Sequence, residues 1–298
     1  MSYHRPVLLQ ACIDGLNIKA GGIYVDVTYG GGGHSALILE NLENGKLVAF
    51  DQDPDAADNL PDDERLLFIN QNFRYMKNFL KLHGAIPVDG ILADLGISSW
   101  QIDQPERGFS TRFQGPLDMR MDRQSPLSAR DVVNTFAREE LKNIFKLYGE
   151  LKNAHRIASE IEFHRKTEEI ETTEQLKKVL QKLAPRGKEN KFFAQVFQAL
   201  RIEVNNELDV LKDFLRQSAE VLKPGGRLVV IAYHSLEDRL VKNFIRAGNF
   251  EGEQEKDFFG NVIAPLKSVE KLIVPGQDEQ DENPRSRSAK LRIAEKIV

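Results

Sequence analysis

Three aspartates stand at the ends of short apolar runs early in the chain: Asp26, Asp51 and Asp94. Short runs rich in Val, Ile and Leu are typical of buried β-strands. Parallel strands of an α/β sheet present their ligand sites at their carboxyl ends, so we expect the three carboxylates to line one crevice. There they could accept hydrogen bonds from ribose hydroxyls or an amine, and they would attract a cationic ligand.

A run of glycines, Gly30 to Gly33, follows the first of these strands and precedes the helix-forming residues 36–39. Glycine adopts positive φ at little cost and lets a ligand lie directly against the main chain. A strand, a glycine turn and a helix in this order open a nucleotide-type site in a doubly wound α/β sheet.

The glycine turn fits two ligands. The pattern Asp-x-x-x-Gly-x-Gly, from Asp26 through Gly30 to Gly32, suits S-adenosylmethionine, because its ammonium and sulfonium cations favour a nearby carboxylate. The overlapping pattern Gly-x-Gly-x-x-Ala, which ends at Ala36, also fits the dinucleotide fingerprint. Asp51, about 20 residues further on, would hold the ribose hydroxyls of either ligand. Phe73, beyond the third strand, either flanks an adenine ring or is a core residue at the start of a helix.

Composition limits the class of protein. The chain has 298 residues, 41% hydrophobic and 29% charged, which indicates a soluble globular protein of two lobes or of one domain with a large insertion. No apolar run approaches the ~18 residues of a membrane span, and no signal peptide is evident, so we expect no membrane association. The net charge of -4 excludes a polyelectrolyte for nucleic acid, so RNA would have to bind local basic patches.

Cys12 is the single cysteine of the chain, which excludes a disulfide framework and a cysteine metal site and favours the cytoplasm. We predict no metal site. A cysteine nucleophile would be needed for methylation at a pyrimidine ring carbon, but the apolar surroundings of Cys12 favour a buried small side chain.

The order of elements predicts one α/β domain interrupted by helices. Strands alternate with helices up to about residue 100, helices alone are predicted over most of the next hundred residues, and a fifth strand is predicted at 227–232. Further strands are predicted at 270–274 and 290–294, separated by an acidic loop at 277–282. We therefore predict an α/β domain of residues 1–103 and 207–298, with a helical substrate-recognition insertion, 104–206, that caps its active-site edge.

The chain resembles the bacterial RsmH (MraW) family nearly from end to end. The strings that carry the resemblance are residues 4–9, 28–35, 51–54, 94–99, 107–110, 115–122, 197–202, 234–239 and 283–292. It departs from the family pattern at Trp100, at Leu151 and Lys152, and over 191–195. The last two departures lie in the insertion and concern substrate contacts rather than the cofactor.

The resemblance implies a Rossmann-like class I methyltransferase sheet with S-adenosylmethionine as cofactor. It also implies methylation of N4 of a cytosine in the decoding centre of 16S ribosomal RNA, within the small ribosomal subunit. The implied cofactor residues are Gly32, Gly33, His34, Asp51, Phe73, Asp94 and Gln101. On spacing alone, His34 is a first-turn helix residue with its ring in solvent, and Gln101 is a polar loop residue.

Cytosine N4 is a poor nucleophile because its lone pair is delocalised into the ring. The enzyme must hold the amine in line with the methyl group and supply acceptors for its hydrogens. Asp94 and the carbonyls after it are the best-placed acceptors, although the Asn/Asp-Pro-Pro-Tyr motif of other amino-methyltransferases is missing. Asp118 and His234 are rival catalytic residues, and each could instead be a structural hydrogen-bonding residue.

RNA contacts are predicted in two basic clusters. Arg107, Arg112 and Arg120 follow the fourth strand, and Arg285 and Arg287 lie near the C-terminus. Clusters of this kind are also common on solvated surfaces. Phe109 could stack on a splayed-out base, or it could anchor the insertion on the sheet.

Two other functions are compatible with parts of the sequence. A dinucleotide-binding oxidoreductase is disfavoured by Asp26 and by the lack of a Tyr-x-x-x-Lys pair. A non-catalytic RNA-binding or assembly module is disfavoured by the intact glycine turn and the ribose carboxylate. The sequence leaves open whether the chain forms a homodimer.

Overall fold

The computed structural model describes residues 6–297 and divides into two compact units. The first contains Met1–Gly96 and Leu208–Val298, and the second contains Ile97–Glu207. His4 and Arg5, part of the N-terminal string shared with the family, lie outside the described residues. Within residues 6–297 no helix is both long enough and apolar enough to cross a membrane.

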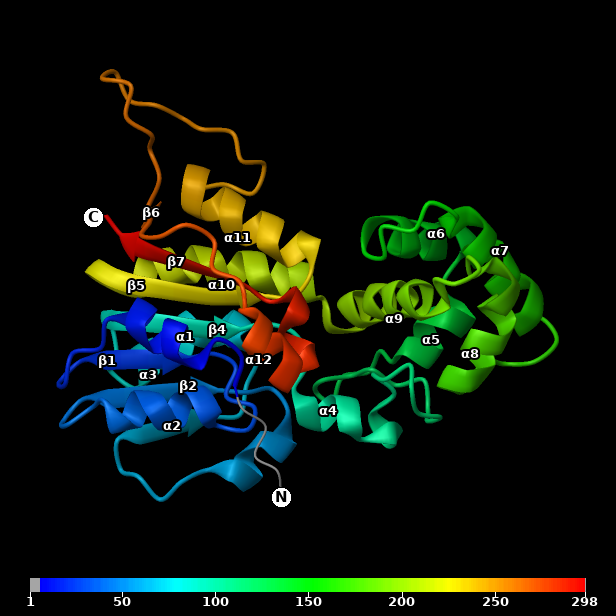
Figure 1. Cartoon of the computed structure of the whole chain (residues 1–298), viewed down its shortest axis with the longest axis horizontal. Helices are drawn as coiled ribbons and strands as arrows, with labels where there is room; N and C mark the ends of the chain where they lie inside the picture. Colours follow the sequence, from blue (N-terminus) through cyan, green and yellow to red (C-terminus); the bar gives the residue numbers. More distant parts are fainter. Residues whose placement is uncertain (1–5, 298) are drawn as a thin grey trace. The chain divides into compact units, whose positions relative to one another are not determined.

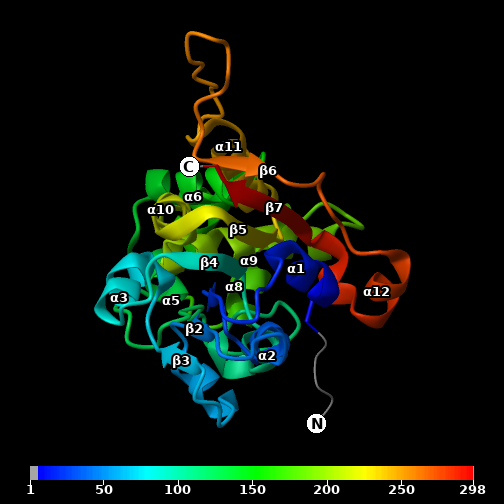
Figure 2. The same cartoon turned by 90° about the vertical axis from the view of Figure 1, so that its left-hand side faces the viewer.

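The first unit is built on a seven-stranded sheet with the order β3-β2-β1-β4-β5-β7-β6. Figure 1 labels six of these strands and Figure 2 labels β3. The first five strands run parallel, whereas β7 is antiparallel to both β5 and β6. The strands are β1 (Ile23–Asp26), β2 (Lys46–Phe50), β3 (Leu66–Ile69), β4 (Val88–Asp94), β5 (Leu222–Ala232), β6 (Leu266–Ser268) and β7 (Lys290–Lys296).

Helices cover both faces of this sheet (Figure 2). One face packs against α1 (Leu9–Leu16) and α2 (Gly33–Glu40), in a core that includes the buried Cys12. The other face packs against α3 (Met76–Leu82), α10 (Glu207–Val221) and α11 (Ser235–Ala247). Each fully buried large apolar side chain contributes about 1.5–3 kcal/mol to such a core. The strands themselves are apolar on both faces, as expected of a covered parallel sheet.

The register of the parallel strands brings their carboxyl ends to one edge. Asp26 pairs with Ala49 of β2 and with Leu92 of β4, and Asp94 pairs with Ile231 of β5. Residues that end or immediately follow β1, β2, β4 and β5 therefore lie close together. This edge is called the carboxyl edge below.

The second unit is helical and has its own apolar core. Its helices are α4 (Ser99–Asp103), α5 (Ala129–Thr135), α6 (Arg138–Leu147), α7 (Ala154–Arg165), α8 (Thr173–Leu180) and α9 (Glu189–Asn205). Capping boxes start α4 at Ser98, α5 at Ser128 and α8 at Thr172, so local polar side chains satisfy the first free N–H groups of these helices. Among the described residues of this unit, β pairing is limited to one isolated bridge, between Pro116 and Thr172.

Short 3-10 segments connect several elements: η1 (Pro54–Asn59), η2 (Phe73–Tyr75), η3 (Pro105–Arg107), η4 (Gln181–Leu183) and η5 (Pro284–Ser288). The strand predicted at 270–274 is wrong, since β6 lies at 266–268 and Ile273 makes only an isolated bridge to Leu291. The acidic loop predicted at 277–282 is wrong, because these residues form the helix α12 (Gln277–Glu282). A hydrogen bond between the side chains of Gln277 and Asp281, one helical turn apart, stabilises it.

The second unit begins at Ile97, earlier than the residue 104 predicted from the sequence. Ile97 packs against the apolar core of the second unit, and the short helix α4 follows it. This boundary could not be predicted, because a five-residue helix has too few positions to show a periodic pattern.

Candidate functional site

The glycine turn between β1 and α2 is constrained at some positions and open at another. Gly30 and Gly32 have φ of 52° and 77°, and a Cβ on Gly32 would lie 2.6 Å from the Tyr29 hydroxyl oxygen. A Cβ on Gly33 would lie 2.3 Å from Cγ of Pro6. A Cβ on Gly31 would meet nothing within 4 Å. The turn thus needs glycine at 32 for its own conformation and at 33 for the close approach of Pro6, while at Gly31 the main chain faces open space.

Asp26 is buried beneath this turn and holds it in place. Its Oδ1 accepts a hydrogen bond from the Thr28 amide (3.0 Å), and its Oδ2 accepts one from the Ser35 hydroxyl (2.7 Å). Burial raises the pKa of Asp26, against the effect of nearby His34 and of these hydrogen bonds. The sequence predicts Asp26 as a cofactor-site carboxylate near the cations of the ligand. The structure shows it 1% exposed and anchoring the turn, and its role toward the cofactor stays a prediction.

Asp51 follows β2 at the carboxyl edge and meets the glycine turn. Its two carboxylate oxygens accept hydrogen bonds from the amides of Gly30 (2.8 Å) and Asp53 (2.9 Å). Burial raises its pKa to about 6, in part opposed by these two bonds. Each oxygen keeps a further lone pair, so the carboxylate can accept the two hydrogen bonds of a ribose diol.

Asp94 ends β4 and is held by residues of three other segments. Its Oδ1 accepts a hydrogen bond from the Tyr233 hydroxyl (2.7 Å), and its amide donates to the Thr28 hydroxyl oxygen (2.7 Å). Its Oδ2 lies 3.9 Å from Nδ1 of His34. Burial raises the pKa of Asp94 to about 6, against the lowering effects of His34 and of the Tyr233 hydrogen bond.

His34 is buried in the first turn of α2, so the alternative with its ring in solvent is wrong. Its Nε2 lies 3.1 Å from the carbonyl oxygen of Val7. A carbonyl only accepts, so Nε2 carries the hydrogen and Nδ1 faces Asp94. His34 therefore orders the N-terminal segment and lies beside the carboxylate.

The carboxyl edge of the first unit therefore gathers three carboxylates, the buried Asp26 and the half-buried Asp51 and Asp94. Each has a raised pKa because burial disfavours its charged form, and Asp26 raises the pKa of both others. A cationic ligand would relieve that repulsion, whereas a pyrophosphate would add to it. The electrostatics of the crevice thus favour the cationic ligand of the two that the glycine pattern allows.

Two other predicted cofactor residues lie in different settings. Phe73 is half-buried in η2, and its ring meets Phe214 of α10 edge-to-face at 5.4 Å, in keeping with the alternative of a core residue. Gln101 belongs to the second unit. Its side chain accepts a hydrogen bond from the Ser98 amide (3.1 Å) and completes the capping box of α4, so it is a helix residue rather than the loop residue of the alternative.

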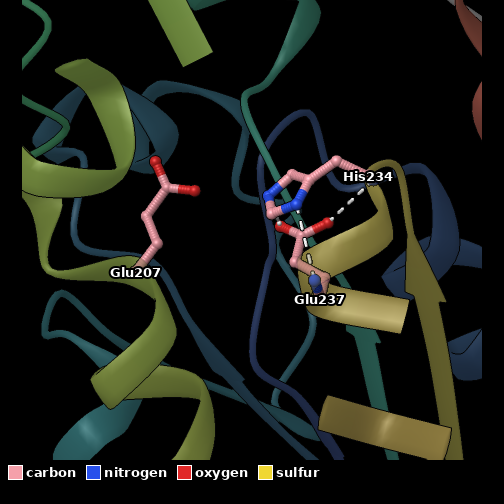
Figure 3. A group of neighbouring side chains, drawn as sticks. All are labelled: Glu207, His234 and Glu237. Carbon is pink, nitrogen blue, oxygen red and sulfur yellow. Dashed lines mark hydrogen bonds and ion pairs between the residues drawn. The ribbon is translucent and has the colours of Figure 1, made fainter. Parts of the chain in front are cut away.

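Two rival catalytic residues have structural partners. His234 is the N-cap of α11: its Nδ1 accepts from the Glu237 amide (3.4 Å) and its Nε2 lies 3.1 Å from Glu237 Oε1 (Figure 3). Asp118, in the second unit, accepts hydrogen bonds from Nε (3.0 Å) and Nη2 (2.7 Å) of Arg120. Asp94 is linked to the glycine turn through the hydroxyl of Thr28.

Several predicted RNA contacts need correction. Arg107 is 2% exposed, and its Nη2 donates to the carbonyl oxygens of Arg120 and Met121, both at 3.0 Å. Phe109 is 6% exposed and packs in the core of the second unit, so it is unavailable for base stacking. Arg120 is half-buried and committed to Asp118 and to the Ser125 carbonyl (2.8 Å). These side chains hold the segment 107–125 together.

The remaining predicted RNA contacts are more accessible. Arg112 and Arg287 are exposed, and Arg285 is half-buried in η5. The structure leaves the RNA-binding role of these three arginines as a prediction.

Sequence reasoning missed three residues at the carboxyl edge: Thr28, Ser35 and Tyr233. Thr28 and Ser35 hydrogen-bond Asp26, and Thr28 also ties the turn to β4. Tyr233 comes directly after β5, the strand beside β4, so its position next to Asp94 could have been inferred from strand order.

The sheet has an antiparallel β7 between β5 and β6, and its carboxyl edge carries carboxylates around a glycine turn. Together these features define a class I S-adenosylmethionine-dependent methyltransferase. Its methyl donor is S-adenosylmethionine, and the oxidoreductase and non-catalytic alternatives are wrong. The chain belongs to the MraW methylase family, whose model matches residues 1–297.

Relatives match this chain over nearly their whole length. A Flavobacterium johnsoniae protein named ribosomal RNA small subunit methyltransferase H is 59% identical over 298 residues, covering 100% of this chain and 99% of the relative. A protein of the same name from Christiangramia forsetii is 56% identical, with the same coverage. A solved rRNA methylase from Streptococcus thermophilus shares 12% identity at a TM-score of 0.46, with 100% of both chains covered, and we infer nothing from that likeness.

Proposed function

We propose that this protein transfers a methyl group from S-adenosylmethionine to N4 of a cytosine in the decoding centre of 16S ribosomal RNA, within the small ribosomal subunit in the cytoplasm. The observation that carries the substrate is the similarity, over nearly the whole chain, to proteins named ribosomal RNA small subunit methyltransferase H. The position of the methyl group rests on the family resemblance of the sequence.

The residues at the carboxyl edge fit S-adenosylmethionine. Asp51 would take the ribose hydroxyls, and the open main chain at Gly31 leaves room for a ligand. Asp26 and Asp94 supply the negative potential that a ligand with ammonium and sulfonium groups favours. When bound, the cofactor supplies the methyl group as an electrophile.

Asp94 would act on the cytosine amine. Its Oδ1 is fixed by Tyr233, which leaves lone pairs on Oδ2 to accept a hydrogen bond from N4. That bond would orient the amine and polarise its N–H bond, which makes the nitrogen lone pair available as the new N–C bond forms. The bond between the methyl group and the sulfonium would break at the same time, and S-adenosylhomocysteine would leave. Methylated N4 must then lose one proton, and the Asp94 carboxylate would receive it and pass it to water. When His34 is protonated, it would stabilise the charged form of Asp94.

We propose that the second unit, through Arg112, serves substrate recognition, and that Arg285 and Arg287 of the first unit also contact RNA. The cofactor role of Gln101 stays a prediction of the family resemblance. Exposed arginines attract phosphates whatever the sequence of the RNA, so these residues would add affinity rather than choose the base. The homodimer that the sequence leaves open is tested by light scattering at working concentration.

The test is methyl transfer to small ribosomal subunits that lack the modification, and to free 16S rRNA in parallel, with a labelled methyl group. Mass spectrometry of nuclease fragments then locates the label. We expect one cytosine to gain one methyl group at N4. A label on another base, or no label on either substrate, would contradict the proposed function.

A further inference from the structure

The segment between α11 and β6, residues 249–265, forms a loop that projects from the sheet of the first unit (Figures 1 and 2). At its tip stand Phe258 and Phe259, which are 97% and 85% exposed. Their rings meet edge-to-face at 5.8 Å. Two adjacent aromatic side chains so fully exposed to water are a feature of interaction sites.

The tip is an ordered turn. Oδ1 of Asp257 accepts hydrogen bonds from the amides of Phe259 (2.9 Å) and Asn261 (2.9 Å), and Oδ2 accepts one from the Asn261 side chain (3.0 Å). These bonds hold the pKa of Asp257 below its usual value. The stem is closed by the Ile263 amide, which donates to the Glu255 carbonyl (2.8 Å). A turn ordered in this way presents the two rings at a low entropic cost of binding.

The base of the loop is also anchored. Phe250 stacks on Phe244 of α11 at 5.4 Å, and the Arg216 guanidinium lies over its ring at 4.9 Å. The Asn249 side chain accepts a hydrogen bond from the Gly252 amide (2.8 Å). The aromatic tip is thus connected to the fold through a packed stem.

The loop emerges near the amino-terminal ends of the parallel strands, whereas the carboxyl edge lies at their other ends. It ends at Leu266, which pairs with Lys296 of β7, and the adjacent Glu295 pairs with Arg227 in β5. Arg227 in turn pairs with Gly90, near the start of β4, whereas Asp94 ends that strand. A partner that binds the tip would therefore contact the enzyme at the opposite end of the strands from the target nucleotide. It would be a different part of the substrate particle.

The charge of the loop identifies the kind of partner. Residues 251–263 carry four carboxylates, Glu251, Glu253, Glu255 and Asp257, against a single Lys256, which gives a net charge of -3. Phosphates of RNA would be repelled by this stem, while a basic surface would be attracted.

We propose that the loop 249–265 is a docking element that inserts Phe258 and Phe259 into an apolar recess on a basic protein of the small ribosomal subunit. The element holds the enzyme on the particle while the carboxyl edge acts on the RNA. The choice of the ribosomal particle rests on the proposed function.

One experiment identifies the partner directly. The photo-crosslinking residue p-benzoyl-L-phenylalanine replaces Phe258 in the full chain, or Leu82, which is 74% exposed on α3, as the control. Each protein is irradiated with purified small subunits that lack the modification. We expect position 258 alone to crosslink to a subunit protein through a Lys- or Arg-rich surface. Crosslinking to rRNA, to a second copy of this chain, or no more than at position 82 would overturn the proposal.

Kinetics with the same subunits test affinity and charge. We expect F258S/F259S to raise KM for subunits about tenfold with kcat and cofactor affinity unchanged, as for loss of an aromatic anchor. E253Q/E255Q should also raise KM, because the basic partner loses its attraction. An unchanged KM in either variant, or a lower KM in E253Q/E255Q as expected for RNA, would overturn the proposal. If the unmodified chain fails to methylate subunits, the proposed function fails, while the crosslink still tests docking.

Discussion

The carboxyl edge of the first unit and the segment 107–125 of the second are both rich in ionisable side chains, yet they use them differently. In the segment, Arg107 is saturated by carbonyl oxygens and Arg120 is paired with Asp118. At the carboxyl edge, Asp51 and Asp94 keep spare acceptor capacity, and their pKa values are raised because burial outweighs their hydrogen bonds. Ion pairs and hydrogen bonds whose partners are all internal stabilise a fold, whereas carboxylates with raised pKa values and spare acceptor capacity create a place for a charged ligand.

Loss of Asp51 should produce the largest effect on cofactor binding. In Asp51→Ala we expect affinity for S-adenosylmethionine to fall by about 1.5–3 kcal/mol, because charge-assisted hydrogen bonds to the ribose disappear. Isothermal titration calorimetry measures the change, and thermal unfolding checks that the variant is folded. An unchanged affinity in a folded protein would remove Asp51 from the cofactor site.

Loss of the Asp94 charge should reduce catalysis. Asp94→Asn keeps the acceptor for Tyr233 but weakens acceptance of the N4 hydrogen, so we expect turnover at saturating substrates to fall more than about tenfold, or ~1.4 kcal/mol. Asp89→Asn is the matched control, since Asp89 lies at the start of the same strand and is bound to Lys223 (2.7 Å). Normal turnover in Asp94→Asn would make Asp94 structural and return attention to Asp118 and His234.

The pH dependence of stability should distinguish the carboxyl edge from ordinary ion pairs. Both Asp51 and Asp94 have a pKa of about 6 when folded, above the usual 3.8. The folded state therefore binds more protons than the unfolded state in this range, and the free energy of unfolding should rise by about 2–3 kcal/mol, roughly half from each carboxyl, as the pH falls from 7 to 5. Cofactor affinity should fall over the same range, because the cation needs the ionised carboxylates.

Urea unfolding without cofactor, at pH 5 and at pH 7, measures this rise, and calorimetry measures the affinity. The double variant Asp51→Asn/Asp94→Asn is the control and should show a flatter dependence in both measurements. If stability and cofactor affinity both fall as the pH falls, burial does not raise the pKa values of these carboxylates.

Much of the first unit could be predicted from the sequence, because its strands are short apolar runs with acidic or glycine ends. Asp26 and Asp94 end β1 and β4, as the apolar runs before them predict, and Asp51 and Asp94 lie at one edge because parallel strands must align. The anchoring of Asp26 by Ser35 could not be predicted, since it depends on which way a side chain turns. Burial of Arg107 and Phe109 was also hidden, because a loop rich in Arg and Gly shows no periodicity that separates core from surface.

Two arginines of the second unit should have the smallest effect on function. One of them is exposed and the other is paired within the fold. Arg112→Ala should leave stability unchanged and weaken binding to the small subunit a few-fold, with the salt slope reduced by about one because one phosphate contact is lost. Arg120→Ala should instead destabilise the second unit by about 1–3 kcal/mol, because Asp118 loses its counter-ion and the Ser125 carbonyl loses its donor. Binding at several salt concentrations and urea unfolding of both variants separate the two roles. If Arg112→Ala leaves the salt slope as it is, Arg285 and Arg287 become the preferred phosphate contacts.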